Sequence, residues 1–124
     1  MILDASAVVA LLFQEPGHTV VASHIGTASI STVNLAEVLS RCVRADIDPR
    51  AVDQQLQEIG LNYLPLTPDI AMLVAQLEPH CRPLGLSLGD RACLATALAC
   101  NDAVLTTDRV WGELDLDLDI QILR

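Results

Sequence analysis

Two short apolar runs, each followed by an aspartate, constrain the fold more than any other feature of this chain. Ile2 and Leu3 precede Asp4, the run 103–107 precedes Asp108, and a helical pattern follows each aspartate. Short apolar runs also alternate with helical patterns elsewhere in the chain, which is typical of a parallel sheet with helical crossovers. We therefore predict an α/β domain with a central parallel sheet.

Apolar periodicity and the residues that start and stop helices predict the individual elements. Strands are expected at 1–4, 28–30, 61–66, 103–107 and 118–123. Helices are expected at 5–13, 18–25, 32–45, 50–59, 67–77, 87–101 and 109–113, with a proline-containing loop at 78–86. Pro65 predicts that its strand ends there or lies at an edge of the sheet, because proline cannot donate to the ladder.

Length and composition bound the remaining possibilities. The 124 residues predict one domain, and 52% hydrophobic residues allow a sizeable core. No apolar run approaches the ~20 residues of a membrane span, and the N-terminus lacks the basic region of a signal peptide, so a cytoplasmic protein is expected. The four cysteines show no CxxC spacing and are expected to be reduced and mostly buried: Cys42, Cys81, Cys93 and Cys100.

The segment 114–122 alternates strictly between apolar and polar residues. Its aspartates, Asp115, Asp117 and Asp119, would share one face of an extended chain. Ile120 stands where a calcium loop requires its turn glycine. An edge strand, or the stretch that leads into one, with a charged outer face is therefore the favoured interpretation.

Four acids form the candidate site. Asp4 and Asp108 end strands at one edge of the predicted sheet, and ligands bind at that edge of parallel α/β folds. Glu37 and Asp90 lie near the starts of two further helices, from which they can reach the same place. Clustered carboxylates without a lysine repel one another, and Mg²⁺ or Mn²⁺ would relieve that repulsion through hard oxygen ligands.

Each acid also has an ordinary structural explanation. Asp4 and Asp108 stand where aspartate caps a following helix, and Ser87 with Asp90 fits the S-x-x-D pattern of a capping box. Glu37 shares a helix face with polar residues and could be an ordinary solvated side chain. These explanations stay open for each acid taken alone, whereas the joint pattern favours a site.

Hydroxyl and arginine side chains accompany the acids. Ser6 and Thr106 are placed to orient carboxylates that hold a metal. Arg91 and Arg109 each adjoin a site acid in sequence and are candidates to contact phosphates of a bound substrate, although surface ion pairs would explain them as well.

Four segments resemble the motifs of one family: MILDASAVVALL, STVNLAEVLSR, LSLGDRACLATALA and AVLTTDRVW. In this order and spacing, from residue 1 to about 111, they resemble PIN-domain ribonucleases, above all the VapC-type toxins of bacterial toxin–antitoxin pairs. The resemblance implies a PIN-like three-layer α/β/α domain over residues 1–124. It also implies an endoribonuclease that uses Mg²⁺ or Mn²⁺, forms a homodimer and is inhibited by an antitoxin.

The resemblance implies that Asp4, Glu37, Asp90 and Asp108 form the acidic site, supported by Ser6 and Thr106. In phosphodiester hydrolysis a divalent ion activates water and stabilises charge at the phosphorus and at the leaving oxygen. We expect Asp4 and Asp90 to bind the ion directly. Glu37 would bind it or position the attacking water, and Asp108 would hold a second ion or orient a metal-bound water.

The net charge of −9, from 16 acids and seven arginines without a lysine, argues against direct DNA binding. The same charge suits a basic antitoxin segment, which we expect to place an arginine or lysine among the acids. The expected dimer face comprises helices 32–45 and 48–59.

Two phosphoryl-transfer folds, the haloacid-dehalogenase and response-regulator types, also begin with an aspartate after the first strand. Both require a lysine, and this chain has none. A non-catalytic module with the PIN fold, holding RNA or protein, stays open as the alternative.

Overall fold

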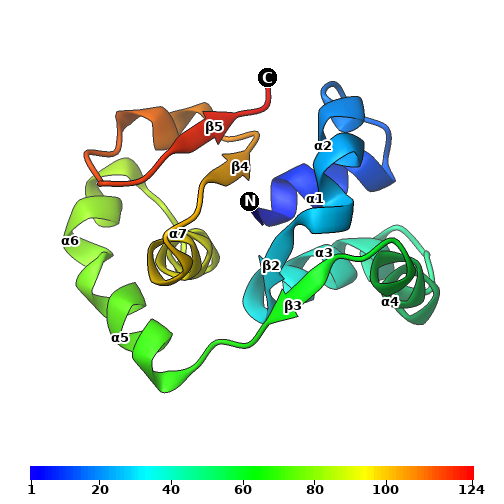
Figure 1. The fold of residues 1–124 in the computed structure, drawn as a ribbon, viewed down its shortest axis with the longest axis horizontal. Coiled ribbons are helices and arrows are strands. Elements are labelled where there is room, and N and C mark those ends of the chain that lie inside the picture. The colour runs from blue at the N-terminus through cyan, green and yellow to red at the C-terminus, as the bar shows by residue number, and fades with distance from the viewer.

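The computed structural model describes residues 1–124 and contains one five-stranded sheet in which every pair of neighbours is parallel. The strand order is β3-β2-β1-β4-β5, so the first strand of the chain lies at the centre of the sheet (Figure 1). The strands are β1 (Ile2–Leu3), β2 (Ser29–Ser31), β3 (Asn62–Leu64), β4 (Val104–Thr106) and β5 (Ile120–Ile122). The predicted parallel α/β sheet is confirmed.

Seven α-helices and three 3₁₀ segments connect these strands. The α-helices are α1 (Ala5–Leu12), α2 (His18–His24), α3 (Thr32–Arg44), α4 (Pro49–Glu58), α5 (Pro68–Gln76), α6 (Glu78–Cys81) and α7 (Leu88–Cys100). The 3₁₀ segments are η1 (Ile25–Thr27), η2 (Arg82–Leu84) and η3 (Arg109–Glu113). None of the helices combines the length and the apolar character that crossing a membrane requires.

Helices cover both faces of the sheet, which gives the predicted three layers. On one face, Leu3, Ile30 and Leu105 pack in a core cluster with buried side chains of α1 to α4. On the other face, Ile2 and Val104 pack with buried side chains of α5 and α7. Figure 1 shows α5, α6 and α7 on one side of the strands and α1, α2 and α4 on the other. Alternate side chains of β1 and β4 therefore serve the two cores, as strand geometry requires.

The predicted loop at 78–86 is wrong, because α6 and η2 occupy most of it. Pro79 and Pro83 are the second residues of these two short helices. The missing N–H of proline has no partner within the helix there, and its fixed φ suits the first turn. The two prolines therefore start helical turns instead of breaking them.

The end of the sheet differs slightly from the sequence expectation. The final strand is only Ile120–Ile122, shorter than the predicted 118–123. The preceding leucines, which include Leu116 and Leu118, are half-buried against the α7 side of the core, while the aspartates between them are exposed. This segment therefore leads into an edge strand, with its charged face outward. β3 is the opposite edge strand and stops just before Pro65, as predicted.

The register of the central strands positions the candidate site. Ile2 pairs with Val104 and Leu3 pairs with Leu105, so the residues that follow the two strands come out side by side. The amide of Asp4 donates to the carbonyl of Leu105 at 2.9 Å. The carboxyl edge of β1 and β4 therefore holds Asp4 next to the end of β4.

Candidate active site

Asp4 lies at the carboxyl end of β1 and is only 5% exposed. Its Oδ2 accepts hydrogen bonds from the hydroxyls of Ser6 at 2.6 Å and Thr106 at 2.9 Å. Its backbone occupies the N-cap position of α1, but its side chain accepts no hydrogen bond from that helix. Helix capping therefore does not explain this buried carboxylate, and Ser6 and Thr106 fix its orientation.

Burial raises the pKa of Asp4 to about 6. The hydroxyls of Ser6 and Thr106 lower this pKa, and the negative charges of Asp90 and Glu37 raise it. Both of these carboxylates therefore lie close enough to Asp4 to act on its charge. A cation among the three would favour the ionised form of Asp4.

Glu37 projects from α3 toward the first turn of α7. The side-chain amide of Asn34, one turn earlier, donates from Nδ2 to Glu37 Oε1 at 2.7 Å and to the Gly89 carbonyl at 2.9 Å. A Cβ at position 89 would lie 2.7 Å from both carboxylate oxygens of Glu37. Gly89 thus leaves the space that the Glu37 carboxylate fills, and Asn34, fully buried, holds that carboxylate beside α7.

Asp90 forms a capping box with Ser87 at the start of α7. Asp90 Oδ2 accepts from the Ser87 amide at 2.8 Å, and the Asp90 amide donates to Ser87 Oγ at 3.1 Å. The capping explanation for Asp90 is therefore realised. Below it, Cys93 is fully buried, and burial followed by the charges of Asp4, Asp90 and Glu37 raises the pKa of its thiol. The charges of Asp90 and Glu37 thus act on both Asp4 and Cys93.

Asp108 lies at the end of β4, beyond these three acids. Its Oδ1 accepts from the Val110 amide at 3.0 Å and so caps η3, while its own amide donates to Thr106 Oγ1 at 3.1 Å. Asp108 is not among the groups whose charge raises the pKa of Asp4. The structure thus groups three of the four predicted acids and connects the fourth to them through the hydroxyl of Thr106.

The two arginines predicted to contact RNA both donate to backbone carbonyls. Arg91 Nη1 donates to Val74 in α5 at 2.9 Å, and Arg109 Nε donates to Arg124 at 2.9 Å. The hydrogen bond from Arg91 therefore joins α7 to α5. In these positions the two side chains support the fold.

A cavity of about 330 Å³ opens beside the acids. It is lined by Ala5, Ser6, Val9, Glu15, Glu37, Arg41, Arg44, Thr107 and Arg124. Sequence reasoning missed its arginines, although the spacing of Arg41 and Arg44 from Glu37 on one helix was a usable signal. Nothing in the sequence indicated that Arg124 joins them.

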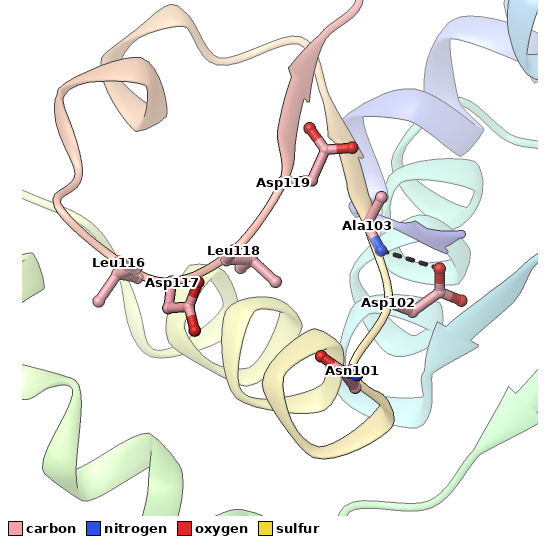
Figure 2. Close-up of a pocket in the computed structure, with 7 residues that line it drawn as sticks. All are labelled: Asn101, Asp102, Ala103, Leu116, Asp117, Leu118 and Asp119. Carbon is pink, nitrogen blue, oxygen red and sulfur yellow. Dashed lines mark hydrogen bonds between the residues drawn. The ribbon is translucent and has the colours of Figure 1, made fainter.

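The largest cavity, about 430 Å³, lies elsewhere (Figure 2). Its polar residues, including Asp102, Asp117 and Asp119, precede β4 and β5. They therefore lie at the amino ends of these strands, whereas Asp4 lies at the carboxyl end of β1. Figure 2 shows the Asp102 carboxylate turned back to the Ala103 amide, at 2.8 Å. None of the predicted site residues lines this cavity.

The donor set of the site suits a hard divalent ion, because Asp4, Glu37 and Asp90 supply only carboxylate oxygens and none of them forms a salt bridge. As the side chains stand, no three Asp, Glu, His or Cys residues are close enough together to hold one metal ion. Instead, Glu37 accepts a hydrogen bond from Asn34, and Asp90 accepts one from the Ser87 amide. Shared coordination requires at least one of these carboxylates to rotate.

The chain matches the family model described as PIN domain over residues 1–116. Comparison with curated protein sequences finds no match.

Similar solved structures include chains of toxin–antitoxin complexes. A complex from Klebsiella pneumoniae is 17% identical, with 92% of each chain covered and a TM-score of 0.75. A DNA-bound VapBC from Salmonella typhimurium is 15% identical, with 99% of this chain and 97% of that chain covered and a TM-score of 0.74. VapBC-5 from Mycobacterium tuberculosis is 26% identical, with 99% and 96% covered and a TM-score of 0.62.

The structural similarities agree with the fold described above. Because the family model spans residues 1–116 of 124, this chain belongs to the PIN-domain family.

Proposed function

We propose that this protein is a metal-dependent endoribonuclease and the toxin of a toxin–antitoxin pair. One observation carries the proposal: a buried carboxylate, Asp4, lies at the carboxyl edge of the sheet with Glu37 and Asp90 near enough to raise its pKa. Like charges held close together destabilise the folded protein, so a purely structural role does not account for this arrangement. Membership of the PIN family and similarity to chains of toxin–antitoxin complexes support the assignment.

In this proposal the acids hold Mg²⁺ or Mn²⁺, which supplies water activation and charge stabilisation in phosphodiester hydrolysis. Asp4 and Asp90 are the direct ligands. The hydroxyls of Ser6 and Thr106 donate to one carboxylate oxygen of Asp4, and this would orient the other oxygen toward the ion. Glu37 would bind the ion or position the attacking water.

Asp108 has a less central role in the proposal. Its carboxylate caps η3, and its backbone amide bonds Thr106, which in turn bonds Asp4. From this position it would hold a second ion or orient a metal-bound water. Removing its carboxylate should therefore reduce cutting less than removing that of Asp4.

The proposed partner is an antitoxin with a basic segment. The net charge of −9 attracts such a segment, and its arginine or lysine would enter among Asp4, Glu37 and Asp90. Co-expression with the neighbouring reading frame should restore growth and co-purify a complex. Harmless expression of the chain alone in its host, with no neighbour that binds, would overturn the toxin assignment but not the nuclease assignment.

A non-catalytic PIN module remains the second candidate. It is favoured by the capping hydrogen bonds of Asp90 and Asp108, and by the absence of three acids placed to share a metal. Such a module would bind RNA or protein through the same surface without cutting RNA.

RNA cleavage by purified protein separates the two candidates. We expect cutting with Mg²⁺ or Mn²⁺, none in excess chelator, and none by Asp4→Asn with either metal. A matched control is Asp69→Asn, which removes one acid from the first turn of α5, away from the site. Cutting that persists in chelator, or in Asp4→Asn, would overturn the metal mechanism.

A further inference from the structure

The arginines of this acidic chain are unevenly distributed. The net charge is −9, yet three of the seven arginines, Arg41, Arg44 and Arg124, line one cavity. Only two acids line it with them, Glu15 and Glu37. Arginines therefore outnumber acidic side chains in the lining, and one of the two acids, Glu15, is paired with Arg124. The cavity is thus a basic recess in a surface that is otherwise acidic.

The arginines of α3 are aligned with the acidic site. Glu37, Arg41 and Arg44 are spaced i, i+4 and i+7, which places them on one stripe of the helix. At ~1.5 Å of rise per residue, Arg41 lies about 6 Å and Arg44 about 10 Å from Glu37 along the helix axis. These three side chains thus extend from the acids into the basic recess, over about the length of a few nucleotides of a single strand.

Two of the three arginines, Arg41 and Arg124, are held at the cavity by other contacts. Arg41 lies over the ring of Phe13, with its guanidinium carbon 5.3 Å from the ring centre. Arg124 donates to the Pro16 carbonyl at 3.0 Å and lies 3.5 Å from the Glu15 carboxylate. Arg41 and Arg44 form no salt bridge within the chain, so their charge is available to a ligand.

The cavity also shares walls with the acidic centre. Ser6, whose hydroxyl donates to Asp4, and Glu37 line both. Thr107 adds a further hydroxyl, and its amide donates to Ser6 Oγ at 3.0 Å. A strand whose scissile phosphate lies at the acids would therefore bring its neighbouring phosphate to the guanidinium groups, which bind phosphate oxygens in pairs.

We propose that the recess lined by Arg41, Arg44 and Arg124 binds a backbone phosphate of the RNA strand, next to the bond that is cut. This inference rests on the proposed nuclease function. It assigns the RNA contact to arginines that line the cavity beside the acids. Arg91 and Arg109, for which this contact was predicted, donate to backbone carbonyls instead. The recess thereby gives this lysine-free chain a local positive surface to which a polyanion can bind.

Direct binding tests the proposal without relying on cleavage. The probe is a short, fluorescent, mixed-sequence RNA with 2′-O-methyl groups, and the readout is anisotropy across a salt series. We expect Arg41→Gln with Arg44→Gln to weaken binding by tenfold or more, since each charge-assisted contact is among the stronger hydrogen bonds. The slope of log K against log salt should fall by about 0.7 for each phosphate contact removed.

The matched control is Arg50→Gln with Arg82→Gln, which removes two exposed arginines from other surfaces. It should retain both affinity and slope. With cleavable RNA, the double variant of α3 should raise KM more than it lowers kcat, because the lost contact supports binding in both ground and transition states.

The outcomes separate this inference from the proposed function. If wild-type protein cuts RNA and the Arg41 and Arg44 variant binds the probe as tightly as wild type, only the phosphate recess is wrong. If wild-type protein neither binds nor cuts any RNA, the proposed nuclease function fails and the inference fails with it. If the variant loses binding of a co-expressed protein partner while RNA affinity is unchanged, the recess belongs to the partner and the inference is wrong.

Discussion

Gly89 and Glu37 fit together because Gly89 has no side chain: a Cβ at this position would lie 2.7 Å from both carboxylate oxygens of Glu37. The glycine is in the first turn of α7 and needs no unusual backbone angle. Its role is therefore to leave space, and the space is filled by an acid of the candidate site.

Gly89→Ala should consequently displace the Glu37 carboxylate while α7 still forms, because alanine favours helices and the end of the glutamate side chain can move. We expect RNA cleavage to fall by roughly a hundredfold, the usual cost of misplacing a reacting group by about 1 Å. Gly112→Ala is the control, since its Cβ meets nothing within 4 Å. Wild-type cleavage by Gly89→Ala, with its fold verified by circular dichroism, would remove Glu37 from the chemistry.

Asn34 should act as a positioning residue for Glu37. It is fully buried and joins Glu37 to the Gly89 carbonyl, so Asn34→Ala removes a donor from both the Glu37 carboxylate and that carbonyl. We expect a loss of about 1–3 kcal/mol of unfolding free energy, together with a lower kcat at nearly unchanged KM. Thr96→Ala is the control, because it loses a buried hydrogen bond to the Ala92 carbonyl without touching Glu37. Equal kcat in both variants would assign Asn34 to stability alone.

The position of the acids could be predicted from sequence because it follows from topology. Parallel strands present their carboxyl ends on the same side of the sheet, so the residues that follow β1 and β4 had to come out side by side. The register pairing of Leu3 with Leu105 then places Asp4 beside Thr106. Local pattern was sufficient for this part of the site.

Contacts between distant segments were not predictable in the same way. The donation from Asn34 to Gly89 spans 55 residues and depends on the missing side chain of a glycine. The cavity arginines come together only because Arg124, at the far end of the chain, folds back beside α3. Neither contact has a local pattern, since both follow from how helices pack on the finished sheet.

The pKa of Asp4 predicts a dependence of stability on pH. Burial raises this pKa from 3.8 to about 6, so the folded protein holds the proton more tightly than the unfolded chain. The resulting stability is fully present below about pH 4 and is lost as pH rises through about 6. At ~1.36 kcal/mol per pKa unit, the loss is about 3 kcal/mol.

Asp4→Asn removes this titration and keeps an oxygen that can accept from Ser6 and Thr106. In chelator, we expect the variant to be more stable than wild type at pH 7 and closer to it at pH 4. Urea unfolding at both pH values measures the difference. Parallel pH profiles for the two proteins would show that Asp4 is not the buried titrating group.

Ser87 and Asp90 share a capping box, so their substitutions should separate capping from chemistry. Ser87→Ala removes the cap hydroxyl and should cost ~1 kcal/mol of stability with cleavage retained. Asp90→Asn retains an acceptor for the Ser87 amide but removes the charge, so the fold should persist while cleavage is lost. The reverse pattern, a stable and active Asp90→Asn, would leave Asp90 with the capping role alone.

The last prediction concerns the proposed homodimer. Val43 at the end of α3 and Ile59 after α4 are 58% and 46% exposed, and Ile47 between the two helices is 40% exposed. Exposed apolar side chains on two successive helices are suited to a symmetric interface with a second copy. Val43→Glu with Ile59→Glu should convert the dimer to a monomer, as measured by light scattering at micromolar concentration. Met72→Glu on α5, 61% exposed in the native chain, should leave the dimer intact. A wild-type monomer, or dissociation by the Met72 variant alone, would exclude the α3–α4 face as the interface.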